Sequence, residues 1–168
     1  MITPECVRRL AAYNAWQNRQ LDAAMGKLDH AALLVDRGAF WGSILGTANH
    51  LLWGDATWMA RFGVGAAPER PLADSAALFP THPAWSAERF RLDGRITLWA
   101  EELRAVDLVG RLRWYSGAAG REIEKPVGEI VLHMFNHQTH HRGQIHAMLG
   151  AAGVTAPVSD LFLMPEDG

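Results

Sequence analysis

The sequence predicts an all-α fold, a four-helix bundle in which one long crossover connection joins two of the helices. Four segments place apolar residues at three- and four-residue steps, which is the period of an amphipathic helix. A stretch rich in Gly, Pro and Ala, without a sustained period, separates the second of these segments from the third. The chain has 168 residues, 49% of them apolar, and no internal repeats, so residues 1–168 are expected to form a single domain.

The first predicted helix runs from about Pro4 to Leu28. Thr3 can cap its free N–H groups, and a proline at the first helical position loses no hydrogen bond. Asn14 lies inside the apolar stripe, where a polar side chain needs a partner. Two roles stay open for Asn14: it orients a metal ligand through a hydrogen bond, or it satisfies a buried backbone group.

The second predicted helix spans residues 40–62 and is apolar around most of its circumference, so it should be central and buried. Asn49, His50 and Asp55 interrupt the apolar surface and require partners. The crossover connection follows at residues 63–85.

The third predicted helix starts at Ser86 as its cap and ends near Val106. Phe90 and Leu98 are among its expected inward residues, and Arg89 is expected to point outward. Alternation in the sequence that follows, with two glycines at its centre, predicts a short hairpin or extended excursion. Pro126 then begins the fourth predicted helix, which continues to about Ala152.

Composition excludes several functional classes. The 16 Lys and Arg residues are balanced by 18 Asp and Glu, a net charge of −2, which gives no reason to expect nucleic acid or an anionic membrane as a partner. We find no segment long and apolar enough for a transmembrane helix and no secretory leader. Cys6 is the only cysteine and cannot close an intrachain disulfide, so a cytoplasmic location is expected.

The histidines are distributed unevenly, because five of the eight fall within residues 133–146. On a helix, His133, His137 and His141 form one stripe, and an i, i+4 pair of imidazoles suits a transition metal. Helical bundles complete such sites from a facing helix, and His50 is the one other histidine in an apolar helical segment. These residues predict a three-nitrogen site with an open position, although a lone buried histidine is more often a hydrogen-bonded core residue.

The remaining histidines are expected to have other roles. His140 lies to one side of the stripe, His146 points away from it toward the surface, and His30 and His82 are in loop-like surroundings. The sequence contains no HExxH motif and no repeated Glu-x-x-His, so common zinc proteases and di-iron bundles are disfavoured.

Three segments resemble the DinB-like family of metalloproteins, which is named for a damage-inducible bacterial protein. They are YNAWQN at 13–18, the stretch at 37–62, and HMFNHQTHHRGQIHAML at 133–149, whose H-x-x-H-H-R-G-Q core is the most specific. The resemblance implies an up-down-down-up four-helix bundle, often a homodimer. It also implies a mononuclear divalent-metal site whose ligands correspond to His50, His137 and His141.

The resemblance leaves the roles of other motif residues open. Gly143 is expected to allow close helix packing, and Arg142 serves either the structure or a substrate anion. His140, Gln144 and Asp55 are candidates for a catalytic acid or base.

Two classes of function are compatible with the resemblance. In the first, the protein is a zinc- or nickel-dependent enzyme acting on a small molecule, either by thiol S-transfer with a low-molecular-weight thiol or by hydrolysis. The cation would lower the pKa of a bound water or thiol. In the second, the protein is a non-enzymatic metal-binding or stress-response bundle in which the ion is structural. A third possibility is that the histidines only pack and bind no metal.

Overall fold

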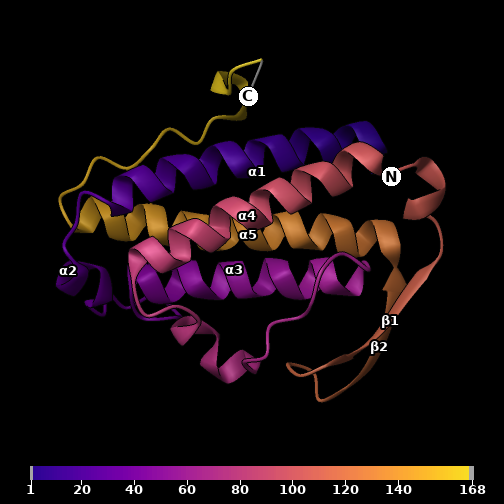
Figure 1. The fold of residues 1–168 in the computed structure, drawn as a ribbon, viewed down its shortest axis with the longest axis horizontal. Coiled ribbons are helices and arrows are strands. Elements are labelled where there is room, and N and C mark those ends of the chain that lie inside the picture. Colours follow the sequence, from indigo (N-terminus) through magenta and orange to yellow (C-terminus); the bar gives the residue numbers. More distant parts are fainter. Residues whose placement is uncertain (1, 167–168) are drawn as a thin grey trace.

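The computed structural model describes residues 2–166, which are mostly helical with one small two-stranded sheet (Figure 1). The four long helices pack side by side, α1 against α4 and α5, and α3 against the same two helices. No helix in the described part of the chain is both long and apolar enough to cross a membrane. The long helices are α1 (Pro4–Met25), α3 (Ile44–Arg61), α4 (His82–Glu102) and α5 (Val127–Ala151).

The shorter elements connect the long helices. The strands β1 and β2 form an antiparallel hairpin, which confirms the predicted excursion and corrects the all-α expectation. The predicted crossover contains one 3₁₀ helix, η1, which packs against α3. These elements are α2 (His30–Leu34), η1 (Leu72–Ala77), η2 (Ala105–Leu108), β1 (Arg111–Ser116), β2 (Arg121–Pro126) and η3 (Leu161–Leu163).

The helix starts follow local capping chemistry. The Thr3 hydroxyl accepts a hydrogen bond from the N–H of Cys6, as the sequence predicts. Ser43 caps α3 in the same way, so this helix begins after a turn rather than at residue 40. The expectation that Ser86 caps the third helix was wrong. Extended Thr81 occupies that position, and a proline follows in the first turn, where it costs no hydrogen bond.

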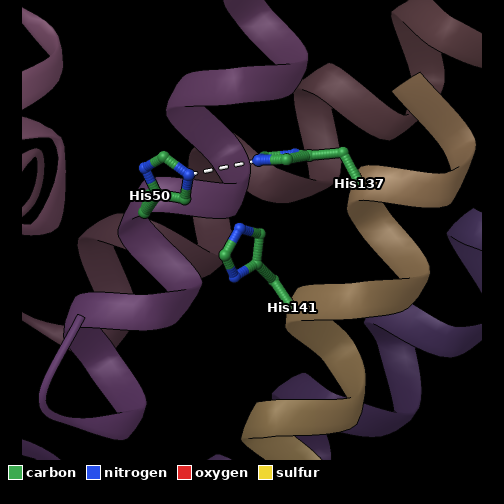
Figure 2. A group of neighbouring side chains, drawn as sticks. All are labelled: His50, His137 and His141. Atoms are coloured by element: carbon green, nitrogen blue, oxygen red, sulfur yellow. Dashed lines mark hydrogen bonds between the residues drawn. The ribbon is translucent and has the colours of Figure 1, made fainter. Parts of the chain in front are cut away.

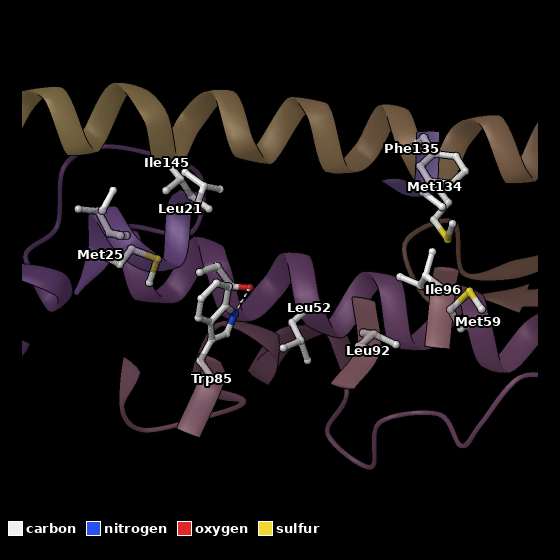
Figure 3. Packing of buried hydrophobic residues seen from close by; sticks show 14 of the residues in the cluster. Leu21, Met25, Leu52, Met59, Trp85, Leu92, Ile96, Met134, Phe135 and Ile145 are labelled. Carbon is white, nitrogen blue, oxygen red and sulfur yellow. Dashed lines mark hydrogen bonds between the residues drawn. The ribbon is translucent and has the colours of Figure 1, made fainter. Parts of the chain in front are cut away.

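Apolar side chains from all four long helices form one continuous core (Figure 3). Trp85 is 2% exposed, and its indole N–H donates to the backbone carbonyl of Ala48 at 2.9 Å, which ties α4 to α3. Phe90 and Leu98 are 77% and 61% exposed, so the expectation that they point inward was wrong. The largest fully buried side chains include Met25, Leu45, Leu52, Met59, Trp85, Leu92, Ile96, Met134 and Ile145.

A buried polar network crosses this core and contains a residue expected at the surface. Arg89 is 2% exposed, and its guanidinium donates to Asp55 and to Asp93, at 2.7 Å in each case. The expectation that Arg89 points outward was wrong, because two buried carboxylates need this cation as a partner. Asn18 on α1 also donates to Asp93 at 2.9 Å, and Gln138 on α5 donates to Asp55 at 2.9 Å. The network therefore joins all four long helices.

We predict that Arg89→Ala lowers the free energy of unfolding by about 3–5 kcal/mol, because it leaves two buried carboxylates without their ion-pair partner. Urea unfolding at pH 7 measures this change. Arg91→Ala is the matched control, since exposed Arg91 pairs with Glu88 at the surface and its loss should change stability by about 1 kcal/mol or less. Equal losses in the two variants would contradict the assigned role of the network.

Candidate metal centre

Three histidines from two helices converge at one point (Figure 2). His50 projects from α3, and His137 and His141 project from successive turns of α5. One ring nitrogen from each histidine lies within 4.8 Å of those of the other two. The Nε2 atoms of His50 and His137 are 3.2 Å apart. The structure thus brings together the three residues that the sequence singled out as ligands.

Hydrogen bonds orient two of the imidazole rings from behind. The Nδ1–H of His141 donates to the side-chain carbonyl of Gln144 at 2.8 Å, which leaves Nε2 with a free lone pair in the neutral ring. The Nδ1 of His50 lies 2.9 Å from the hydroxyl of Ser75, a fully buried residue on η1. Partners of this kind fix the ring orientation of a metal ligand.

The donor set fits a divalent transition metal. With Nδ1 engaged, His50 and His141 direct Nε2 toward the convergence point, where His137 also places its Nε2. The Nδ1 of His137 is buried and has no hydrogen-bond partner among the described residues. Three neutral imidazoles are a favourable ligand set for zinc or nickel, and a shared cation would satisfy lone pairs that otherwise face one another.

Burial keeps these rings in the form that binds metals. Removal from water and, to a smaller extent, the nearby His141 together lower the pKa of His50 to about 3. Lost hydration, together with the neighbouring histidines, lowers the pKa of His137 to about 3, and lost hydration also lowers the pKa of His141. All three imidazoles are therefore neutral at pH 7, as coordination requires.

Gly54 makes room for His137 and is a residue that the sequence reasoning missed. A Cβ at this position would lie 2.8 Å from Cε1 of the His137 ring, closer than real contacts allow. Any side chain on α3 at this point would push His137 away. Gly143, by contrast, has no neighbour within 4 Å of where its Cβ would be, so its expected role in close helix packing was wrong.

Trp41 and Ser75 are two further residues that sequence reasoning missed. The Trp41 ring stacks on His50 at 4.0 Å between centroids, and it precedes α3. Ser75 lies in the aperiodic connection, where no pattern distinguishes it. The sequence separation of Trp41 and His50 does not by itself indicate that their rings stack.

The three candidate acid–base residues differ in their surroundings. His140 is exposed, and its ring lies 4.8 Å from that of His141, edge to face. Gln144 holds His141, as described above. Asp55 is fully buried in the polar network, where burial raises its pKa while Arg89 and Gln138 favour its charged form.

Other residues that the sequence singled out have structural partners. Asn14 donates a hydrogen bond to Asp93 at 3.2 Å and accepts one from the buried guanidinium of Arg142. These hydrogen bonds of Asn14 and Arg142 do not involve the three histidines. His146 is half-buried, and its Nε2 lies 2.9 Å from the carbonyl oxygen of Pro157. His133 packs edge to face against Trp58, with ring centroids 5.3 Å apart.

A pocket of about 740 Å³ opens beside His50 and His137. Its walls come from α3 and α5, from the 67–72 part of the connection, and from the β1–β2 hairpin. Pockets of this size hold small organic ligands. The arrangement thus combines a candidate cation site with an adjoining space that a small molecule can enter.

Comparison with known proteins agrees with the fold. The DinB family model matches residues 1–167. Protein DinB of Bacillus subtilis (strain 168) is 26% identical over 160 residues, covering 92% of this chain and 91% of its own length. The crystal structure of a DinB-like protein from Bacillus cereus ATCC 10987 superposes with a TM-score of 0.65 at 15% identity, covering 85% of this chain and 90% of the other. The chain belongs to the DinB family.

Proposed function

We propose that this protein binds one divalent metal ion, zinc or nickel, through His50, His137 and His141. The observation that carries the proposal is the convergence of three neutral imidazole nitrogens within 4.8 Å of one another. Ser75 and Gln144 support it, because they hold two of the rings in the orientation that coordination needs.

We further propose that the protein is an enzyme acting on a small molecule. The pocket beside His50 and His137 favours this over a purely structural ion, because structural sites are closed by protein ligands. A divalent cation there supplies Lewis-acid chemistry and lowers the pKa of a bound water or thiol. Thiol S-transfer with a low-molecular-weight thiol and hydrolysis are the two reaction types this supports. The protein's own contribution is to orient the imidazoles and to bound the pocket with aromatic side chains.

The proposal includes an architecture and a setting. The pairwise packing of the four long helices supports an up-down-down-up four-helix bundle, formed as a single domain over residues 1–168. Exposed Phe90 and Leu98 on α4 offer apolar surface for a homodimer. The single cysteine supports a cytoplasmic location, and the near-neutral charge argues against nucleic acid as a partner.

We predict that untagged protein carries stoichiometric zinc or nickel and that His50→Ala, His137→Ala and His141→Ala each lose most of it. Each variant removes one of three nitrogen ligands. Elemental analysis of the purified proteins measures the metal content. His146→Ala is the control on the same helix, and it should keep the wild-type content because His146 contacts Pro157 instead. Full metal content in any of the three ligand variants would refute the assignment.

We predict that Gly54→Ala weakens metal binding at least about tenfold, because the new methyl group displaces the His137 ring. Competition with a chelator measures the affinity. Gly143→Ala on α5 is the matched control. It has open space around its Cβ and should leave the affinity unchanged while stabilising the helix by up to about 1 kcal/mol. Unchanged affinity in Gly54→Ala would contradict the geometry assigned to His137.

We predict that the metal-free protein loses stability as the pH falls from about 6.5 toward 3. The unfolded chain binds protons at the ordinary histidine pKa of about 6.5, whereas burial keeps the pKa of His50 and His137 at about 3 in the folded state. Each residue then costs on the order of 1–2 kcal/mol at pH 5. Urea unfolding at several pH values tests this. His137→Asn should have a shallower dependence than His146→Asn, and equal slopes would oppose the explanation.

A further inference from the structure

The pocket beside the three histidines contains a cation that has no carboxylate partner within residues 2–166. Arg61, the last residue of α3, lines this pocket and is half-buried. Its guanidinium carbon lies 4.4 Å from the centroid of the Trp58 ring and 5.6 Å from that of Trp114. Within residues 2–166 no carboxylate lies within ion-pair distance of it, and its guanidinium makes no hydrogen bond. The aromatic rings hold this group in place but leave its donors free.

The other charged groups that line the pocket do not neutralise Arg61. Lys125 and Glu129 pair with each other at 3.6 Å on the hairpin side. Arg70 and Glu69 lie on the opposite connection, where both are exposed and form no ion pair with each other within residues 2–166. The charged side chains of the lining have a net charge of +1, and among its cations Arg61 is the one that is half-buried against aromatic rings. Burial also lowers its pKa, which shows that the guanidinium has lost part of its hydration, and a poorly hydrated cation attracts an anion more strongly.

The wall around Arg61 is aromatic and apolar. Trp114 from β1 meets Trp58 from α3 edge to face, with centroids 5.4 Å apart, and Ile123 of β2 is the cross-strand partner of Trp114. On the other side, the indole N–H of Trp53 donates to the carbonyl of Arg70 at 2.7 Å and holds the connection beside the pocket. An apolar body can bury its surface here while a terminal anion reaches the guanidinium fork.

We propose that this pocket binds a small organic acid whose carboxylate pairs with Arg61 and whose apolar or aromatic body packs against Trp58 and Trp114. The remaining end of the molecule faces His50 and His137, and this orientation rests on the proposed metal site. Arg61 is thereby a specificity residue that selects acids over neutral molecules of the same shape. The pairing with Arg61 itself needs no metal.

The experiment compares an acid with its uncharged isostere. Isothermal titration of the full chain, both metal-free and zinc-loaded, uses 4-phenylbutyrate and 4-phenylbutyramide as probes. We expect the acid to bind at least about fivefold more tightly than the amide in both forms, because only the acid can form a charge-assisted pair with the fork. Equal affinities, or no binding of the acid, would overturn the proposal.

Variants separate Arg61 from other sources of anion binding. Arg61→Gln should lose the preference for the acid and keep the affinity for the amide, whereas Arg121→Gln makes the same charge change on the exposed hairpin, outside the pocket lining, and should change neither. Arg61→Lys should retain part of the preference. If Arg61→Gln fails to fold, the affinities of Arg61→Lys for the acid and the amide test the role of Arg61 instead. A preference for the acid that persists without Arg61 would overturn the assignment.

The two proposals can fail separately. Acid binding that occurs only with zinc present and survives in Arg61→Gln means that the carboxylate binds the ion, which supports the metal centre and refutes the role of Arg61. Acid binding that depends on Arg61 in a protein that never takes up metal supports the role of Arg61 and refutes the metal centre. Elemental analysis of Arg61→Gln, expected to match the wild type, completes the distinction.

Discussion

The positions of the three histidines in this structure depend on one buried ion network that joins the four long helices. Asp55 on α3 accepts from Arg89 on α4 and from Gln138 on α5, and Asp93 extends the network to α1 through Asn18. Sliding any helix by one turn would leave a carboxylate or a guanidinium buried without a partner, at a cost of several kcal/mol. Apolar packing tolerates small shifts far better, because it has no direction. The polar network is therefore what fixes the relative register of the helices.

The register brings the histidines together. Gln138 and His137 are neighbours on α5, and Asp55 and Gly54 are neighbours on α3, so the Gln138–Asp55 hydrogen bond places the His137 ring over the glycine. His50 lies about one turn before Gly54 on the same helix and meets His137 from that side. The stability of the fold and the geometry of the candidate metal centre thus depend on adjacent residues, and a change in one register would disturb both.

Helical periodicity and residue type predicted the elements that carry the histidines, because these elements are long and regular. The i, i+4 spacing of His137 and His141 and the isolation of His50 in an apolar segment indicated the site without a structure. Periodicity failed for α4, where it placed Phe90 inward and Arg89 outward. A charged side chain can be buried only where it has a partner of opposite charge. Asp93 is 4 residues from Arg89 in the sequence, but Asp55 is 34 residues away, so a local pattern could detect only Asp93. Gly54 and Ser75 were missed because their roles exist only across helices.

The candidate ligands that the sequence predicted lie on regular helices, whereas the hairpin and the connection supply parts of the pocket wall that it did not predict. The three histidines lie on α3 and α5, where the polar network holds them, and a cation needs fixed ligands. Trp114 and the 67–72 connection instead come from a hairpin and an irregular segment, which determine the shape of the pocket. Segments of this kind are the parts of a fold that tolerate changes in length and composition most readily. The regular helices thus position the histidines, the irregular segments shape the pocket, and Arg61 lies at the end of α3, beside Trp114 of the hairpin, where these two parts meet.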